Sequence, residues 1–423
     1  MRKCTLSFII AGTLGLSALT PALTLADEAT LKQEIDDLKA QNKLILERLD
    51  ATAEMMESSS STDASTAPTV HDHGASGEGT LRDRTFGIHG SKGKTSIGAY
   101  GEMHYNNLSN QKTGGDDLKE MDFHRFIMFM GHEFSDKIRF WSELEVEHSV
   151  IKDTADGSNG GEVAIEQAFL EFDLNSDMAA RAGILLVPVG LLNETHEPPT
   201  FYGVERNNVE KYILPTTWRE GGASLTGRFA NSFSYDLAVH TGLQISSGGN
   251  YAVRDGRQGV AGAPATDLAA TARLSWVGVP GLSIGAAIQQ QSDITQSTDT
   301  NAGSATLVSA HVDWQINQFR LRSIYASWDL SGNGPASVGA DTQRGWYVEP
   351  SWKFNPKFGV FARASQWDNQ VNSGTDTQYD QYDIGFNYWP HEDVVLKADY
   401  QNQSTPVGKN EYDGINLGIG YQF

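Results

Sequence analysis

Hydrophobic and polar residues alternate with a period of two along most of this chain, from about residue 95 to residue 423. Within residues 137–148, for example, Ile138, Phe140 and Leu144 fall on one face and charged side chains on the other. Because successive side chains of a strand point to opposite sides of a sheet, this pattern predicts strands with one apolar and one wet face. A soluble β-sandwich would alternate in the same way, so alternation alone leaves both architectures open.

The connections between these segments favour a membrane barrel. Short turns such as Ser135-Asp136 alternate strictly with longer loops rich in glycine, serine, asparagine and aspartate, as in outer-membrane barrels. We therefore expect an all-β transmembrane barrel of sixteen antiparallel strands over residues 95–423, enough strands to enclose an aqueous lumen. The expected strands cover residues 95–107, 122–134, 137–149, 163–174, 178–189, 219–229, 233–243, 268–278, 282–292, 306–316, 319–329, 344–354, 358–368, 379–390, 394–403 and 414–423.

Aromatic residues on the apolar faces support the same architecture. They lie beside the short turns or at the C-terminus, where a barrel carries an interfacial girdle. These residues are Phe140, Phe172, Phe229, Phe233, Trp276, Trp314, Phe319, Trp352, Phe354, Phe358, Tyr388, Tyr421 and Phe423. The segment 122–134 fits worst, because it is apolar on both faces, and we expect it to pack against a loop inside the barrel or a neighbouring subunit.

Three different segments precede the barrel. Residues 1–26 combine a basic start, an apolar run too short for a membrane anchor and a small-residue end, which predicts a secretory signal peptide. Residues 27–56 place apolar side chains at alternating spacings of four and three, which predicts a short periplasmic coiled-coil helix and hence an oligomer. A single amphipathic helix is the alternative. Residues 57–94 are mostly small and polar and are expected to form a flexible linker.

Composition narrows the classes of function. The net charge of −21 speaks against a nucleic-acid partner, because phosphate binding needs a basic surface. The one cysteine, Cys4, lies within the signal peptide, so the mature chain has no disulfide and no cysteine-based metal site. His71 and His73 resemble half a metal site, but nothing near them completes a coordination shell. No metal and no other cofactor is expected.

Charged residues on the wet faces are candidates for lining the pore, since the charges in a lumen set its selectivity. The basic candidates, mostly close to the short turns, are Arg139, Arg181, Arg228, Arg273, Arg320, Arg322, Lys353, Arg363 and Lys397. Acidic residues on the same faces nearly balance them in number. The two signs could form a basic rung near the periplasmic exit, or could simply pair across neighbouring strands.

The third long loop, residues 191–218, mixes charges with prolines and aromatics. Loops longer than about 12–15 residues are usually either functional or disordered, and the prolines and aromatics argue for order here. We expect this loop to fold inward and constrict the pore, with packing at the rim of a trimer as the alternative. Its candidate residues are Glu194, His196, Glu197, Tyr202, Glu205, Arg206 and Lys211.

With these features the chain resembles the phosphate-selective porin O and P family of outer-membrane porins. The resemblance rests on the signal and coiled-coil preface, on NETHEPPTFYGVERNNVEKYILPTTWREGG at residues 193–222, and on the terminal GINLGIGYQF. It spans roughly residues 85–423 and implies a trimer of sixteen-stranded barrels with loops folded into the lumen. A preference for phosphate is implied by the resemblance alone, because the wet-face charges do not decide between anions and cations.

The expected function is a water-filled channel in the outer membrane of a Gram-negative bacterium, for passive diffusion of small hydrophilic solutes or inorganic ions. Its expected partners are outer-membrane lipid and further copies of the chain in a homotrimer. An enzyme is not expected, because the scattered histidines form no nucleophile–base grouping. An adhesin or structural barrel whose loops bind a partner is the alternative.

Overall fold

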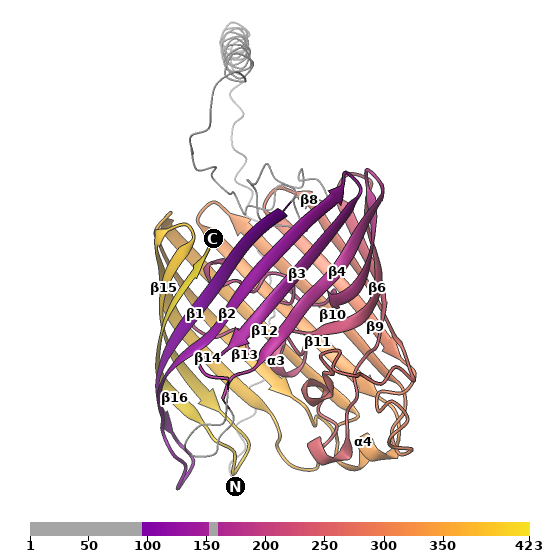
Figure 1. The fold of residues 1–423 in the computed structure, drawn as a ribbon. Helices are drawn as coiled ribbons and strands as arrows, with labels where there is room; N and C mark the ends of the chain where they lie inside the picture. The colour runs from indigo at the N-terminus through magenta and orange to yellow at the C-terminus, as the bar shows by residue number, and fades with distance from the viewer. Residues whose placement is uncertain (1–94, 152–159) are drawn as a thin grey trace, which may run out of the picture. The chain divides into compact units, whose positions relative to one another are not determined.

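The computed structural model describes residues 95–151 and 160–423, which form a closed barrel of sixteen antiparallel strands (Figure 1). The strands are β1 (Thr95–Asn110), β2 (Leu118–Ser135), β3 (Ile138–Glu147), β4 (Val163–Asn175), β5 (Met178–Leu186), β6 (Arg219–Phe229), β7 (Phe233–His240), β8 (Ala269–Val279), β9 (Leu282–Gln291), β10 (Ala305–Ile316), β11 (Phe319–Leu330), β12 (Thr342–Asn355), β13 (Phe358–Asp368), β14 (Tyr379–His391), β15 (Val394–Ser404) and β16 (Tyr412–Gln422). The strands expected from the alternation are confirmed, with their ends shifted by a few residues.

Each strand pairs with its neighbours in sequence, and β1 closes the barrel by pairing with β16. Closure leaves no row of unpaired backbone groups, which lipid would not tolerate. Tight turns join the strands at one end and long loops at the other (Figure 1). In the turn between β8 and β9, Gly281 has a φ of +77°, and a Cβ there would lie 2.2 Å from the carbonyl oxygen of Gln315. Only glycine fits this turn without strain.

The two faces of the barrel differ as the alternation predicted. On β3, Leu144 is exposed on the outside, whereas its neighbours Glu143 and Glu145 are buried on the inside. An apolar outer surface and a polar interior are the arrangement that a spanning barrel requires. Among the girdle aromatics, Phe229, Trp314, Trp352, Phe354 and Tyr388 all expose at least a third of their surface to the outside.

The segment that fitted the alternation worst, within β2, does carry apolar residues on its inner face. Ile127 and Phe129 are buried there in a cluster with Tyr100, Trp141, Phe169 and Leu185. The ring of Tyr100 lies edge-on to the ring of His196, which belongs to the third long loop. Of the two packing partners expected for this strand, the structure has the loop inside the barrel.

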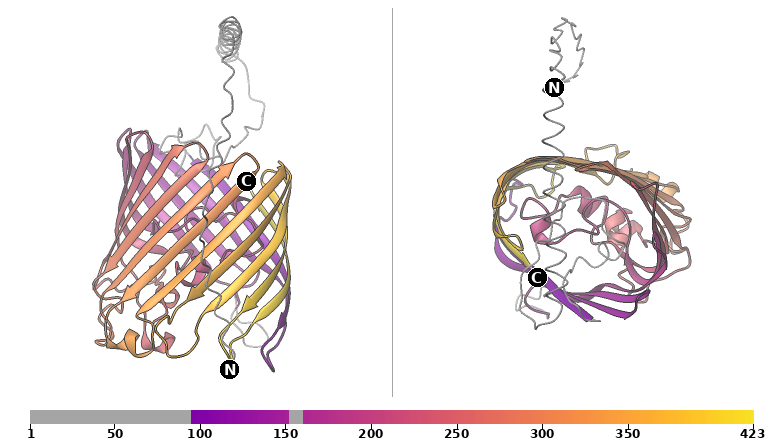
Figure 2. Two further views of the ribbon diagram at one scale, coloured as in Figure 1. Left: turned by 180° about the vertical axis from the view of Figure 1, so that it is seen from behind. Right: turned by 90° about the horizontal axis from the view of Figure 1, so that it is seen from above.

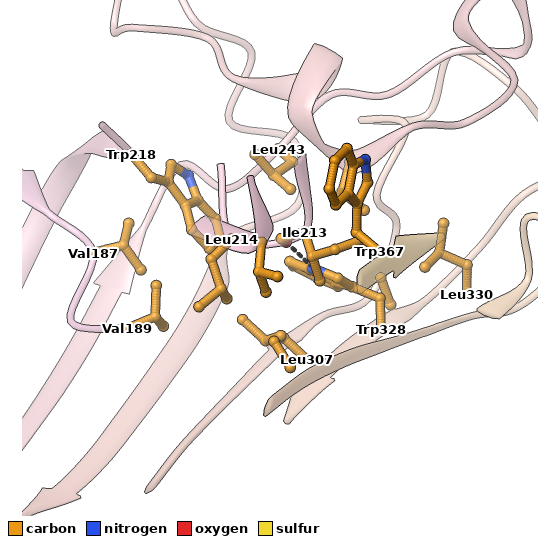
Figure 3. Close-up of a cluster of buried hydrophobic side chains, with 14 of the residues drawn as sticks. Val187, Val189, Ile213, Leu214, Trp218, Leu243, Leu307, Trp328, Leu330 and Trp367 are labelled. Atoms are coloured by element: carbon orange, nitrogen blue, oxygen red, sulfur yellow. Dashed lines mark hydrogen bonds between the residues drawn. The ribbon is translucent and has the colours of Figure 1, made fainter. Parts of the chain in front are cut away.

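A larger apolar cluster fills part of the lumen near the long loops (Figure 3). Strand residues such as Leu307 and Trp328 pack there against Ile213 and Leu214 of the third long loop and against Leu243 of the fourth. All five side chains are almost completely buried. Burying apolar surface contributes about 25 cal/mol of stabilisation per Å². The apolar contacts of this cluster therefore hold these loops inside the barrel.

The signal peptide expected at 1–26, the coiled coil at 27–56 and the linker at 57–94 lie outside the described residues. Within the part of the chain that is described, no helix is long and apolar enough to cross a membrane.

Candidate functional site in the barrel lumen

The third long loop leaves β5 and returns to β6 after running through the inside of the barrel, where short helices lie within the ring of strands (Figure 2). One of them, η2 (Pro198–Thr200), contacts β1, β15 and β16, and another, α3 (Val209–Tyr212), contacts β12 and β13. The loop therefore touches wall strands far from its own. It occupies the lumen, and its role as a constriction stays a prediction.

The neck of this loop is closed by the side chain of Asn193. Its Nδ2 donates to the carbonyl oxygens of Val187 at 2.7 Å and Trp218 at 3.0 Å, and its Oδ1 accepts from the backbone N–H of Trp218 at 2.7 Å. Asn193 is buried, so these bonds satisfy backbone groups that water does not reach. This role could not be predicted from the sequence, because an asparagine in a polar loop is ordinary.

A buried carboxylate, Glu210, holds the middle of the loop together. Its Oε1 accepts the backbone N–H groups of Leu191 at 2.6 Å and Leu192 at 2.7 Å, and its Oε2 accepts from the side chain of Asn207 at 2.9 Å. Burial raises the pKa of Glu210, and these hydrogen bonds offset part of the rise. The network fixes one loop conformation, because each donor would otherwise be buried without a partner.

The far end of the loop is tied to the wall by strand side chains that the wet faces supply. Lys397 Nζ donates to the carbonyl oxygen of Gly203 at 2.8 Å, Asp399 Oδ2 accepts the N–H of Val204 at 2.6 Å, and Asn387 donates to a nearby loop carbonyl. Lys397 also lies 3.5 Å from the ring centroid of Phe201. Lys397, which was expected to line the pore, thus binds the third long loop.

Three of the predicted basic residues also bind the loop while pairing with wall carboxylates. Arg273 pairs with Asp236 and with Glu194 of the loop. Each of the other two donates to a loop carbonyl: Arg322 to that of Thr200 at 3.1 Å and Arg363 to that of Glu205 at 3.3 Å. Their carboxylate partners are Asp313 for Arg322, and Glu349 and Asp383 for Arg363.

The remaining predicted basic residues lie on the inner wall among strand neighbours. Arg139 contacts Glu171 and Asp173, Arg181 contacts Glu171, Arg228 lies 3.8 Å from Asp177, and Arg320 contacts Asp313 at 2.5 Å. Lys353 lies 4.3 Å from the ring centroid of Trp389. Of the two arrangements left open by the sequence, pairing across strands describes the wall arginines. Whether any of these side chains contacts a permeating solute stays a prediction.

Of the predicted loop residues, Glu205 makes the clearest contact with the wall. Its Oε1 lies 2.8 Å from Nδ1 of His104 on β1, and Nε2 of the same histidine lies 3.3 Å from Glu102. Burial would raise the pKa of Glu205, but the charge and hydrogen bond of His104 outweigh burial and hold that pKa well below its usual range. The loop is thereby tethered to β1 by a charged contact.

The other predicted loop residues divide into packed and polar ones. Tyr202 is buried between Phe361 and Trp389, and burial raises its pKa to about 12. His196 is buried beside the inner apolar cluster of β2, whereas Glu197 is only half-buried. Lys211 lies 5.8 Å from the ring centroid of Tyr212.

Three guanidinium groups from two loops converge on one short stretch of the chain, Thr216-Thr217. Arg206 donates to Oγ1 of Thr217 at 3.2 Å, Arg257 donates to its carbonyl at 3.1 Å, and Arg254 donates to the carbonyls of Thr216 at 3.3 Å and Lys211 at 2.7 Å. Among the described residues, none of these three arginines forms an ion pair with a carboxylate within 4.0 Å. We call Arg206, Arg254 and Arg257 the loop arginines.

Burial and the positive charges of neighbouring arginines lower the pKa values of Arg254 and Arg257. Burial and the neighbouring Arg257 lower the pKa of Arg254 to about 10, and burial together with Arg219 and Arg206 lowers the pKa of Arg257. All three remain protonated at neutral pH. Only Arg206 was predicted from the sequence. Arg254 and Arg257 lie in the fourth long loop, and their spacing in VRDGR carries no signal of where that loop folds.

The closed barrel with its polar inner wall is the architecture of outer-membrane barrels, and comparison with known proteins shows the family. The family model for phosphate-selective porin O and P matches residues 97–423. The chain belongs to this family. It is also 30% identical over 369 residues to an uncharacterized protein of Aquifex aeolicus, covering 78% of this chain and 80% of that protein.

Solved porins share the fold at low sequence identity. The anion-selective porin from Comamonas acidovorans is 10% identical, with a TM-score of 0.54 over 78% of this chain and 100% of that one. The outer membrane channel DcaP of Acinetobacter baumannii is 14% identical, with a TM-score of 0.52 over 79% of this chain and 99% of that one.

Proposed function

We propose that this protein is a passive channel that prefers small anions, with the third long loop as its constriction. The observation that carries the anion preference is the convergence of the three loop arginines, which have no carboxylate partner among the described residues. Charges that line the narrow part of a pore decide selectivity, and the total charge of the chain does not. The net charge of −21 is therefore compatible with anion transport.

The chemistry of guanidinium suits this role. An arginine that donates one N–H to a backbone carbonyl keeps further N–H groups for an oxyanion, which it binds in a bidentate fashion. The guanidinium group remains charged over the whole pH range in which a porin works. The wall arginines differ, because each lies beside a carboxylate, such as Asp313, Glu171 or Asp236, that offsets its charge at least in part. Family membership adds support for phosphate as one such anion.

The proposal is tested on the full-length protein in planar bilayers. Stepwise conductance is expected, with a reversal potential under a KCl gradient that indicates preference for chloride. The double variant Arg254→Gln/Arg257→Gln is expected to shift the reversal potential toward cations, while Arg228→Gln, a paired wall arginine, serves as the matched control. Absence of steps would overturn the channel, and an unshifted reversal potential would overturn only the assignment to these arginines.

We also propose a homotrimer in the outer membrane. Supporting it are the heptad seam expected at 27–56 and a solved neighbour, OmpT of Vibrio cholerae, whose structure is described as a trimer form and whose TM-score is 0.51. Light scattering of the detergent-solubilised protein measures the number of chains directly, and a monomer at all concentrations would overturn the trimer.

Nothing in the described residues favours the adhesin alternative.

A further inference from the structure

Three side chains with metal-ligating atoms meet inside the barrel at the base of the third long loop. They are Glu143 on β3, Glu166 on β4 and His196 on the loop, and their ligating atoms all lie within 4.8 Å of one another. Their exposed fractions are 6%, 1% and 4%, so each is more than nine-tenths buried. Side chains of this kind are rarely buried together without a partner that binds them.

The strand register places Glu166 at this point. Glu143 of β3 pairs with Gln167, but the next residue, Leu144, pairs with Ile165, so Glu166 has no partner on β3. An extra residue of this kind re-aims side chains, and such irregularities are common beside functional sites. Here it turns Glu166 inward beside Glu143.

The ligating atoms are open. Among the described residues, neither ring nitrogen of His196 has a hydrogen-bond partner, and neither does Oε2 of Glu143 or Oε2 of Glu166. Nε2 of His196 lies 3.5 Å from Oε2 of Glu166. Two ligands at ~2.1 Å from one tetrahedral ion are ~3.4 Å apart, so this pair already has a suitable separation.

The surroundings hold the ligands in place. Arg219 lies 3.9 Å from Oε1 of Glu166, the oxygen that does not face His196, and so occupies the position of an outer partner. Arg125 donates to the carbonyl oxygen of His196 at 3.0 Å, and its charge is already balanced by Glu102 at 2.6 Å. Two carboxyl groups therefore face the imidazole of His196, with Arg219 nearby.

We propose that Glu143, Glu166 and His196 bind one divalent transition-metal cation, which ties the third long loop to the barrel wall. One imidazole nitrogen with two carboxylate oxygens suits Zn²⁺ and its neighbours in the first transition row better than Ca²⁺ or Mg²⁺, which take oxygen ligands. A fourth position is left for water. The inference departs from the expectation of no metal and does not rest on the proposed function.

A second cluster in the lumen provides a contrast. His104, His124 and Glu205 also bring ligating atoms within 4.8 Å of one another. However, both nitrogens of His104 already face carboxylates, Nδ1 that of Glu205 at 2.8 Å and Nε2 that of Glu102 at 3.3 Å. This cluster is internally satisfied and carries no proposal, which makes His124 a suitable control position.

The test uses full-length protein carrying His71→Ala and His73→Ala, so that the N-terminal histidines do not contribute. After treatment with EDTA and its removal, Zn²⁺ is titrated calorimetrically into the detergent-solubilised protein. We expect one Zn²⁺ per chain, and Glu166→Gln and His196→Gln should each weaken binding at least tenfold. The control His124→Gln should bind as its parent does. Far-UV circular dichroism checks that each variant keeps its strands.

Two results would overturn the site. One is the absence of stoichiometric Zn²⁺ binding by the parent. The other is an unchanged affinity for Zn²⁺ in both Glu166→Gln and His196→Gln, which would mean adventitious binding only. Co²⁺ provides a readout that needs no variant: visible absorption bands that saturate at one ion per chain support the site, and their absence overturns it.

Discussion

The inner wall of the barrel and the loops inside it hold their cations in different ways. On the wall, Arg320 and Arg322 share the carboxylate of Asp313, and Arg363 lies between Glu349 and Asp383. On the loops, Arg254 and Arg257 donate to backbone carbonyls, which carry no net charge. Pairing across strands turns wall cations into structural elements, whereas loop cations keep an uncompensated charge. Selectivity in this barrel is therefore expected to come from the loops.

The largest effect is expected from releasing the third long loop altogether. Glu210→Ala removes the acceptor for the backbone N–H groups of Leu191 and Leu192. A buried N–H left unpaired costs about 1–3 kcal/mol. We expect higher and noisier single-channel conductance and a loss of anion preference, because the loop arginines would no longer be held in place. The exposed Glu120→Ala is the matched control. A quiet channel with unchanged conductance would show that the loop does not depend on this network.

Reversing one loop charge tests the same comparison more selectively. Arg257→Glu places a carboxylate beside Arg206 and Arg254, so we expect the preference for anions to disappear. Little change in stability is expected, because the side chain of Arg257 is exposed. The reversal potential in a KCl gradient measures the change. If it stays where it was, ions do not pass near Arg257.

Acid should loosen the tether between Glu205 and β1. The pKa of Glu205 is lowered in the fold, so its contact with His104 stabilises the loop above the ordinary glutamate pKa of ~4.3 and is lost as the pH falls through the lowered pKa. Channel noise should therefore stay constant from pH 7 to 5 and rise only in stronger acid. Glu205→Gln removes the titrating group, and an identical rise in that variant would assign the effect elsewhere.

The smallest effect is expected on the wall. The wet-face positions of Arg320 and Arg322 predict that replacing both by alanine shifts selectivity toward cations. Because both pair with Asp313, the double variant leaves one uncompensated carboxylate, and we expect a shift in that direction smaller than that of Arg254→Gln/Arg257→Gln. Adding Asp313→Asn removes that carboxylate and should bring the reversal potential only part of the way back, because the parent site carries two cations for one carboxylate. A wall shift as large as the loop shift would contradict the comparison drawn above.

The sequence alone determined the barrel, because the alternation of apolar and polar residues within each strand shows which side chains face outward and which face inward. Alternation, strict alternation of short and long connections, and aromatics near the short turns are all local, and together they predicted the sixteen strands that the structure has. The identity of the family also followed from local stretches, above all residues 193–222, and the family model confirms it.

Only the tertiary structure decided what the charges do. Lys397 and Gly203 are separated by 194 residues in the chain and meet because the loop folds through the lumen. Likewise, Glu166 faces His196 only because the register between β3 and β4 shifts by one residue. Alternation tells which face a side chain lies on, but not which loop reaches it. That information resides in contacts between distant segments, so the partners of the lumen residues could not be predicted from the sequence.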